Sequence, residues 1–268
     1  MSDPPMSVRY PPPHQVQVLA GLFGKRGLPT IGPATASKLH SPTGLAVDGV
    51  GSIYIADPGA GVIERITPDG TLQVLAGQPG RYWPPVQGRA TRRYLHHPSG
   101  VAADSSGNVY VADASSAAIA MITPGGMLLR LAGQLRHRTQ VLRSAPMPGP
   151  AQMSPLYSPC SIAIDQAGNT LTVDPYSGVI VRITPDRLLS LAADIPNEPW
   201  ISMPATVWAF EAELEGKQEP LSDPPIGIAV DATNTIYVAD SYNAVVQKLV
   251  PLPPAGNQTD QAQDSRLY

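Results

Sequence analysis

The 268-residue sequence has a single cysteine, Cys160. With one cysteine, no internal disulfide framework can stabilise the chain. Nowhere do eighteen apolar residues follow one another, so the sequence predicts no membrane-spanning helix. The N-terminal residues MSDPPMSVRYPPPH contain no apolar core, which argues against a signal peptide. These absences together predict a reducing, cytoplasmic setting.

Charge is also scarce, because charged residues make up 15% of the chain and the net charge is -3. Such a small net charge gives no global attraction to nucleic acid or to an anionic membrane. Hydrophobic residues make up 43% of the chain, which is enough for a core, and the length allows one large all-β domain or two smaller ones. The 31 prolines and 24 glycines lie mostly between short apolar runs, as expected for short strands and many turns.

A repeated unit is the main feature of the sequence. Residues 42–77, PTGLAVDGVGSIYIADPGAGVIERITPDGTLQVLAG, contain four short apolar runs that are separated by turn residues. β-Branched residues dominate the runs, which predicts four antiparallel strands joined by tight hairpins. The unit returns three more times, and each copy begins at a proline: Pro42, Pro98, Pro159 and Pro225.

Two aspartates recur in every copy, the first six positions after the proline and the second nine positions later. They are Asp48, Asp57, Asp104, Asp113, Asp165, Asp174, Asp231 and Asp240. Segments such as Asp-Gly-Val-Gly and Asp-Ser-Ser-Gly are typical of hairpin turns in which the carboxylate caps backbone amides and glycine takes a positive φ. We therefore interpret these aspartates as structural turn residues rather than as a carboxylate ladder for metal.

The two ends of the repeat array predict how it closes. Residues 14–21, HQVQVLAG, match the last strand of the unit, whereas the fourth copy has only three strands. Pairing of residues 15–21 with residues 245–250 would complete the fourth sheet and remove exposed sheet edges. The sequence therefore predicts an all-β fold, a β-propeller of four four-stranded blades closed by the N-terminal strand. An array that stays open or pairs with another chain is the alternative.

Three segments follow from this arrangement. Residues 1–13 are expected to be a disordered proline-rich arm, residues 14–251 the propeller, and residues 252–268 a disordered polar tail.

The repeat motifs resemble NHL repeats. PTGLAVDGVGSIYIAD and PSGVAADSSGNVYVAD match the NHL pattern nearly position for position, and CSIAIDQAGNTLTVD and IGIAVDATNTIYVAD match it less fully. The G-x-A-T connector and the terminal LAG are similar to the long-linker variant of bacterial repeat proteins and teneurin-type propellers. The resemblance implies a propeller that serves as a protein- or ligand-binding scaffold through its inter-blade loops. RNA-binding domains, lyases and hydrolases also occur among NHL propellers, which commonly have six blades rather than four.

The position two residues before each repeat proline holds the candidate catalytic residues His40, His96, Tyr157 and Asp223. In a closed propeller these positions would surround the axis at one mouth. Two histidines, a tyrosine and an aspartate could bind a divalent metal or supply an acid and a base, as a metal-dependent lyase or hydrolase requires. The alternative is that they are ordinary loop residues, in which case no cofactor is expected.

Positive charge gathers in the second quarter of the chain. Residues 81–143 contain eight arginines against two acids, whereas residues 194–240 contain nine acids against one lysine. Most of the arginines lie in inter-blade connectors, near Tyr82, Trp83 and Tyr94. Such a patch could bind an acidic protein surface or hold RNA phosphates and stack bases, or it could have no partner. The candidate binding residues are Arg81, Arg89, Arg92, Arg93, Arg136 and Arg138. We expect a protein partner, with RNA as the alternative.

Overall fold

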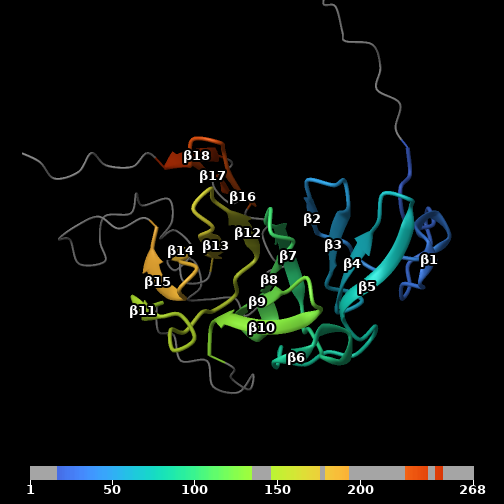
Figure 1. Ribbon diagram of the computed structural model, residues 1–268, viewed down its shortest axis with the longest axis horizontal. Coiled ribbons are helices and arrows are strands. Elements are labelled where there is room, and N and C mark those ends of the chain that lie inside the picture. The colour runs from blue at the N-terminus through green and yellow to red at the C-terminus, as the bar shows by residue number, and fades with distance from the viewer. Residues whose placement is uncertain (1–16, 135–145, 176–178, 193–226, 241–244, 250–268) are drawn as a thin grey trace, which may run out of the picture.

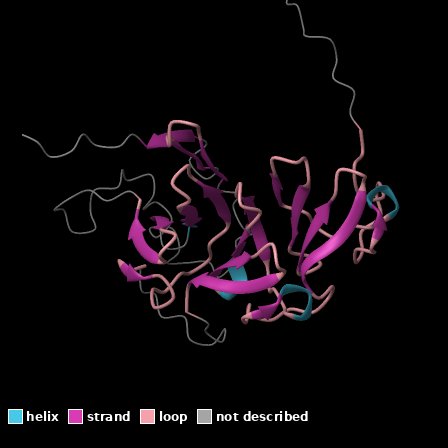
Figure 2. Cartoon of the chain, viewed as in Figure 1, coloured by secondary structure: helices cyan, strands magenta, loops and turns pink. Residues whose placement is uncertain are grey.

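The protein is all-β in its computed structural model, which describes residues 17–134, 146–175, 179–192, 227–240 and 245–249. Four antiparallel sheets follow one another in a ring, so the chain is a four-bladed β-propeller (Figure 1). Figure 2 shows that strands and loops dominate and that helix is confined to short turns. The fold class predicted from the repeats is therefore confirmed. No helix in the described part of the chain is long and apolar enough to cross a membrane.

Each sheet corresponds to one copy of the sequence repeat. Blade 1 contains β1 (Gly32–Pro33), β2 (Gly44–Val47), β3 (Ile53–Asp57), β4 (Val62–Ile66) and β5 (Thr71–Gly77). Blade 2 contains β6 (Gly88–Arg89), β7 (Pro98–Ala103), β8 (Val109–Asp113), β9 (Ala118–Ile122) and β10 (Met127–Ala132). Blade 3 contains β11 (Gly149–Pro150), β12 (Ser161–Ile164), β13 (Thr170–Asp174), β14 (Val179–Ile183) and β15 (Leu188–Leu191). Blade 4 contains β16 (Gly227–Val230), β17 (Ile236–Asp240) and β18 (Val245–Leu249). Short 3-10 helices cover Ala34–Ala36, Ala90–Arg92 and Ala114–Ser116.

The connector before each of the first three blades adds a two-residue strand to the outer edge of that blade. In blade 1, β1 pairs with β5 so that Gly32 lies opposite Leu72. The next residue, Ala34, is buried, and its backbone N–H donates to the carbonyl of Gly70 at 2.9 Å. Blades 2 and 3 repeat this bond through Ala90 and Ala151. The first three sheets therefore have five strands, one more than the sequence predicted.

The core lies between the blades, because side chains alternate along a strand and each sheet can bury both faces. Ile63 of β4 packs in one cluster with Val101 and Val109 of blade 2. In the same way Ile119 of β9 packs with Ile162 of blade 3. Each blade is thus stabilised mainly by its neighbours in the ring.

Closure of the ring by strand pairing stays a prediction. β18 pairs with β17, and the strand pairs of the described residues include none between β18 and residues 17–21. The amide of Gly21 instead donates to the carbonyl of Ala34 at 3.1 Å, which holds this segment against blade 1. The rest of the predicted closing pair, residues 14–16 and 250, lies outside the described residues, as do the arm 1–13 and the tail 252–268.

Candidate functional site

The second aspartate of the first three repeats holds the segment just before the innermost strand. Asp57 is fully buried, and its carboxylate accepts the backbone N–H groups of His40 at 2.6 Å and Ser41 at 2.8 Å. Asp113 is equally buried and accepts from the amides of His96 and His97, both at 2.8 Å. Two charge-assisted bonds to one carboxylate hold the connector in place.

Asp174 makes the same pair of bonds in blade 3, to the amides of Tyr157 and Ser158. The candidate catalytic residues His40, His96 and Tyr157 are therefore all held through their backbone by the buried aspartate of their own blade. The imidazole of His40 lies against Gly59, where a Cβ atom would collide with its ring. His96 and Tyr157 are half-buried, and Asp223 lies outside the described residues.

The predicted metal site gains no support from this arrangement. Among the described residues there is no group of three or more histidine, cysteine, aspartate or glutamate side chains that could hold a metal ion. The metal-dependent interpretation of His40, His96, Tyr157 and Asp223 stays a prediction.

The first aspartate of each repeat caps a hairpin turn. Asp48 accepts the amides of Val50 at 3.1 Å and Ser52 at 2.8 Å, and the hydroxyl of Tyr54 at 2.9 Å. Asp104, Asp165 and Asp231 accept the corresponding amides of their own turns. In blade 4 two hydrogen bonds hold the pKa of Asp231 far below its usual range. The bond from the Thr233 hydroxyl has the larger effect, and the bond from the Thr235 amide has the smaller one.

One buried carboxyl group has no counterpart in the repeat pattern. Glu64 of β4 is fully buried, and neither of its carboxylate oxygens has a hydrogen-bond partner. Burial, together with the nearby charge of Asp57, raises the pKa of Glu64 to about 9. The equivalent positions in blades 2 and 3 are Ala120 and Val181. Sequence reasoning overlooked Glu64 because it searched for residues shared by all copies.

The connector before blade 2 forms the clearest candidate binding surface. Residues 78–97 contain four arginines and no acid. Arg81, Arg89, Arg92 and Arg93 are all exposed. A parallel bridge between Tyr82 and Leu95 brings the first arginine close to the last ones in this connector. The other two predicted binding residues, Arg136 and Arg138, lie outside the described residues.

The connector before blade 1 has the same backbone arrangement. Its bridges Leu22–Lys25 and Arg26–Leu39 correspond to Gln78–Arg81 and Tyr82–Leu95 in the next connector. Residues 17–43 also contain no acid, and their Lys25 and Arg26 are exposed. The sequence analysis did not single out these two cations, although each aligns with a residue of the arginine-rich connector.

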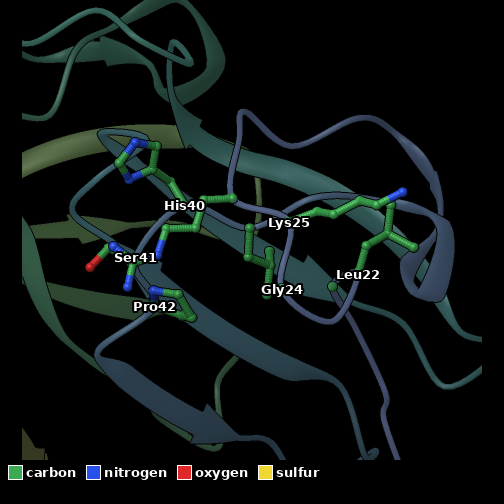
Figure 3. A pocket seen from close by; sticks show the side chains of 9 residues that line it. Leu22, Gly24, Lys25, His40, Ser41 and Pro42 are labelled. Carbon is green, nitrogen blue, oxygen red and sulfur yellow. The ribbon is translucent and has the colours of Figure 1, made fainter.

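A pocket of about 360 Å³ lies where the first connector meets the start of β2 (Figure 3). It is lined by Gly21, Leu22, Gly24, Lys25, Arg26, Leu39, His40, Ser41 and Pro42. Its charged lining residues are both basic, but Figure 3 shows His40 and the end of Lys25 at opposite sides of the pocket. The arrangement provides positive charge, and it does not bring an acid and a base together.

The two basic connectors touch each other. A Cβ atom at Gly80 would lie 3.3 Å from Cδ1 of Leu28, so the second connector lies directly against the first. We call the exposed cations of the two segments the basic connector surface; they are Lys25, Arg26, Lys38, Arg81, Arg89, Arg92 and Arg93.

Comparison with known proteins agrees with the propeller fold. A family profile described as the teneurin NHL domain matches residues 86–262. No curated protein sequence gave a match. A structure of catalytically inactive virginiamycin B lyase from Staphylococcus aureus with quinupristin is similar at 16% identity and a TM-score of 0.44, over 80% of this chain and 57% of the lyase.

Other propellers align in the same way. A putative gluconolactonase is 14% identical with a TM-score of 0.50, over 85% of this chain and 70% of that one. A chain of a nidogen/laminin complex is 19% identical with a TM-score of 0.43, over 81% of this chain and 66% of that one. The chain thus spans 57% of the length of the first of these structures, and the likeness to the putative gluconolactonase concerns the fold alone.

Proposed function

Because the chain belongs to the teneurin NHL domain family, we propose that it is a non-catalytic propeller that binds an acidic segment of a partner protein through the basic connector surface. The observation that carries the proposal is the contact between two connectors that contain no acid and expose seven cations. Single-sign clusters of this kind attract an oppositely charged partner and orient it during association.

An acidic protein segment fits this surface better than RNA does. Single-stranded RNA is held by aromatic rings that are open to stack on bases. The hydroxyl of Tyr82 donates to the carbonyl of Gly59 at 2.7 Å, and its ring lies against Gly61. This tyrosine is therefore fixed to the backbone of blade 1, although Tyr82 is still 44% exposed and Trp83 52% exposed, so RNA is tested beside the acidic peptide.

The lyase or hydrolase alternative has less support. It depends on His40, His96 and Tyr157, whose amides are tied to three separate buried aspartates, and on Asp223, which lies outside the described residues. Tests for a metal-dependent activity would start from these four residues. The cytoplasmic location expected from the sequence also stays a prediction.

The proposal can be tested with two probes, a fluorescent polyglutamate peptide and a fluorescent poly-uridine RNA. The test variant carries Arg92→Glu, and the control carries Arg187→Glu. Both variants change the net charge equally, and Arg187 is exposed in the hairpin turn before β15, outside the two connectors. We expect the peptide to bind the wild type and the control, and to bind the test variant about tenfold more weakly at low salt.

Two results would contradict the proposal. Equal loss of peptide binding in both variants would mean that net charge acts rather than this surface. Binding of RNA without binding of the peptide, abolished by the test substitution, would assign the surface to nucleic acid instead.

A further inference from the structure

Consecutive blades are joined by the same pair of faces. We call the face that packs on the next blade the outgoing face and the face that packs on the previous blade the incoming face. On the outgoing faces of blades 1 to 3 the third strand carries Ile63, Ile119 and Ile180, which are 0%, 0% and 6% exposed. On the incoming faces of blades 2 and 3 the first strand carries Val101 and Ile162, which are 5% and 6% exposed.

The outgoing face of blade 4 is bare. Its third-strand residue Val246 is 75% exposed, although the repeat aligns it with the buried isoleucines of the other blades. Ala229 and Ala239 on the same face are exposed as well, whereas their equivalents in blade 2, Ala102 and Ala112, are buried. The apolar side chains of this face therefore lack the neighbour that covers them elsewhere.

The incoming face of blade 1 is bare at the matching place. Leu45 of β2 is 69% exposed and Val47 is 64% exposed. The equivalent residues of blade 2, Val101 and Ala103, pack against blade 1. The first connector covers only part of the incoming face of blade 1, where Ile55 and Leu72 are buried with Ala34.

A glycine on the innermost strand shows the same difference at backbone level. A Cβ atom at Gly44 would lie 2.7 Å from the carbonyl oxygen of Ser99, and one at Gly100 would lie 2.8 Å from that of Cys160. The first strands of adjacent blades thus approach so closely that only glycine fits. Gly227 of blade 4 occupies the equivalent position, but a Cβ atom there would meet only Ala239 of its own sheet, at 3.6 Å.

We infer that a second copy of this chain covers the two bare faces, with blade 4 of each copy packed on blade 1 of the other. The faces are complementary because they are the same two faces that join blades 1 to 2, 2 to 3 and 3 to 4. Among the described residues neither face is covered, because Leu45 and Val246 are both exposed. The four sheets of one chain thus follow the ring without the described part of blade 4 burying these two side chains against blade 1. The apolar part of the two faces consists of Leu45, Val47, Ala229, Ala239 and Val246. Lys248 lies beside Val246 on the outgoing face, over the ring of Tyr237, at the position of Arg65 and Arg182 in blades 1 and 3.

The contact is head-to-tail, and two copies related by a twofold axis complete one continuous ring with no bare face. The Gly227 strand would then lie against the strand of the partner subunit that begins at Gly44, as Gly100 lies against Cys160 and Ser161 within one chain. The bare faces are separate from the basic connector surface, so this inference and the proposed function can fail independently.

Light scattering coupled to size-exclusion chromatography tests the inference on the whole chain. We expect the wild type to have about twice the monomer mass of 28.2 kDa. Leu45→Glu and Val246→Glu should each give a monomer, because each substitution places a charge in both interfaces of the ring. Val50→Glu is the matched control, since Val50 is 73% exposed in a hairpin turn and lies on neither face, so it should keep the wild-type mass.

Mixing the two monomeric variants gives the sharpest result. The Leu45→Glu copy keeps an intact outgoing face and the Val246→Glu copy keeps an intact incoming face, so their mixture should recover a dimer through one interface. Circular dichroism checks that both variants fold, and Leu45→Ala, which should weaken the dimer about tenfold or more, serves as a milder variant. A monomeric wild type, or a dimer that survives both glutamate substitutions, would overturn the inference.

Discussion

Blade 1 and blade 2 have nearly the same hydrogen bonds and share most of their apolar side chains, such as Ile63 with Ile119. Asp57 and Asp113 each hold two amides at the start of the innermost strand, and Asp48 and Asp104 each cap a hairpin turn. The comparison shows that polar side chains at fixed spacing and a repeated set of apolar residues together define a blade. Where the apolar residues differ, as Ile55 and Val111 do, the change is small and the space between neighbouring blades stays filled.

The main difference between the two blades lies on the third strand. In blade 1 Glu64 is opposite Ile55, whereas in blade 2 Ala120 is opposite Val111. Both residues are fully buried, but only Glu64 carries an ionisable group, and neither of its oxygens has a hydrogen-bond partner. Blade 1 therefore carries an electrostatic cost that blade 2 avoids.

Removal of the buried aspartate should have the largest effect. Asp113→Ala should lower the free energy of unfolding by about 3 kcal/mol, because two backbone N–H groups lose their acceptor inside the protein. Asp57→Ala in blade 1 should cost at least as much, because the Asp57 carboxylate also accepts the buried amide of Ala60 at 3.1 Å. Urea unfolding followed by circular dichroism measures both values.

The order of the two losses is the informative result. A smaller loss for Asp57→Ala than for Asp113→Ala would mean that the additional amide bond from Ala60 contributes nothing to the blade. Unchanged stability in both variants would mean that the two pairs of amide bonds contribute nothing to the blade.

Removal of the buried glutamate should stabilise the protein. Glu64→Val, which places the blade 3 residue in blade 1, should raise the free energy of unfolding at pH 7 by about 1–2 kcal/mol. In the folded protein the pKa of Glu64 is raised to about 9, so the unfolded chain releases this proton at a lower pH than the folded one. The stability of the wild type should therefore fall as the pH rises from the ordinary range of a glutamate to about 9.

That fall should disappear in Glu64→Val and in Glu64→Gln, which cannot ionise. Ala120→Glu is the reciprocal control, because it introduces the same buried carboxyl into blade 2 and should create such a pH dependence there. An identical pH profile for the wild type and Glu64→Gln would show that Glu64 ionises normally in the folded protein.

Sequence reasoning could predict the sheets but not the contacts between connectors. The spacing of Pro42, Asp48 and Asp57 recurs in every copy, and backbone hydrogen bonds within one blade follow directly from such a local pattern. The two-residue strands β1, β6 and β11 escaped prediction because they have no apolar alternation. They form only where a connector returns to the outer edge of its own blade.

Only the part of the candidate site that lies within one connector could be predicted from the sequence. The arginines of residues 81–93 could be recognised from composition, and the structure places all four on the surface. Lys25 and Arg26 were missed because they join the same surface only through the contact between the two connectors. Leu28 of the first connector and Gly80 of the second make that contact. Contacts between residues far apart in the sequence depend on how blades pack, which spacing within one repeat does not encode.

The smallest difference between the two blades should appear in their hairpin turns. Asp104 accepts the side-chain amide of Asn108 at 2.8 Å in addition to the amides of Ser106 and Asn108, whereas the equivalent residue beside Asp48 is Ser52, whose hydroxyl also accepts from Arg65. Asp104→Ala should therefore cost about 1.5 kcal/mol and Asp48→Ala about 1 kcal/mol. Although burial opposes ionisation, these hydrogen bonds hold the pKa of both carboxyls below its usual value, so their contribution is present at neutral pH and lost in acid. Urea unfolding at pH 7 and again at about pH 3, below the usual aspartate pKa, measures the cost of each substitution in free energy of unfolding. We expect this cost to shrink in acid. A cost that does not change with pH would mean that the turn does not depend on the charged carboxylate.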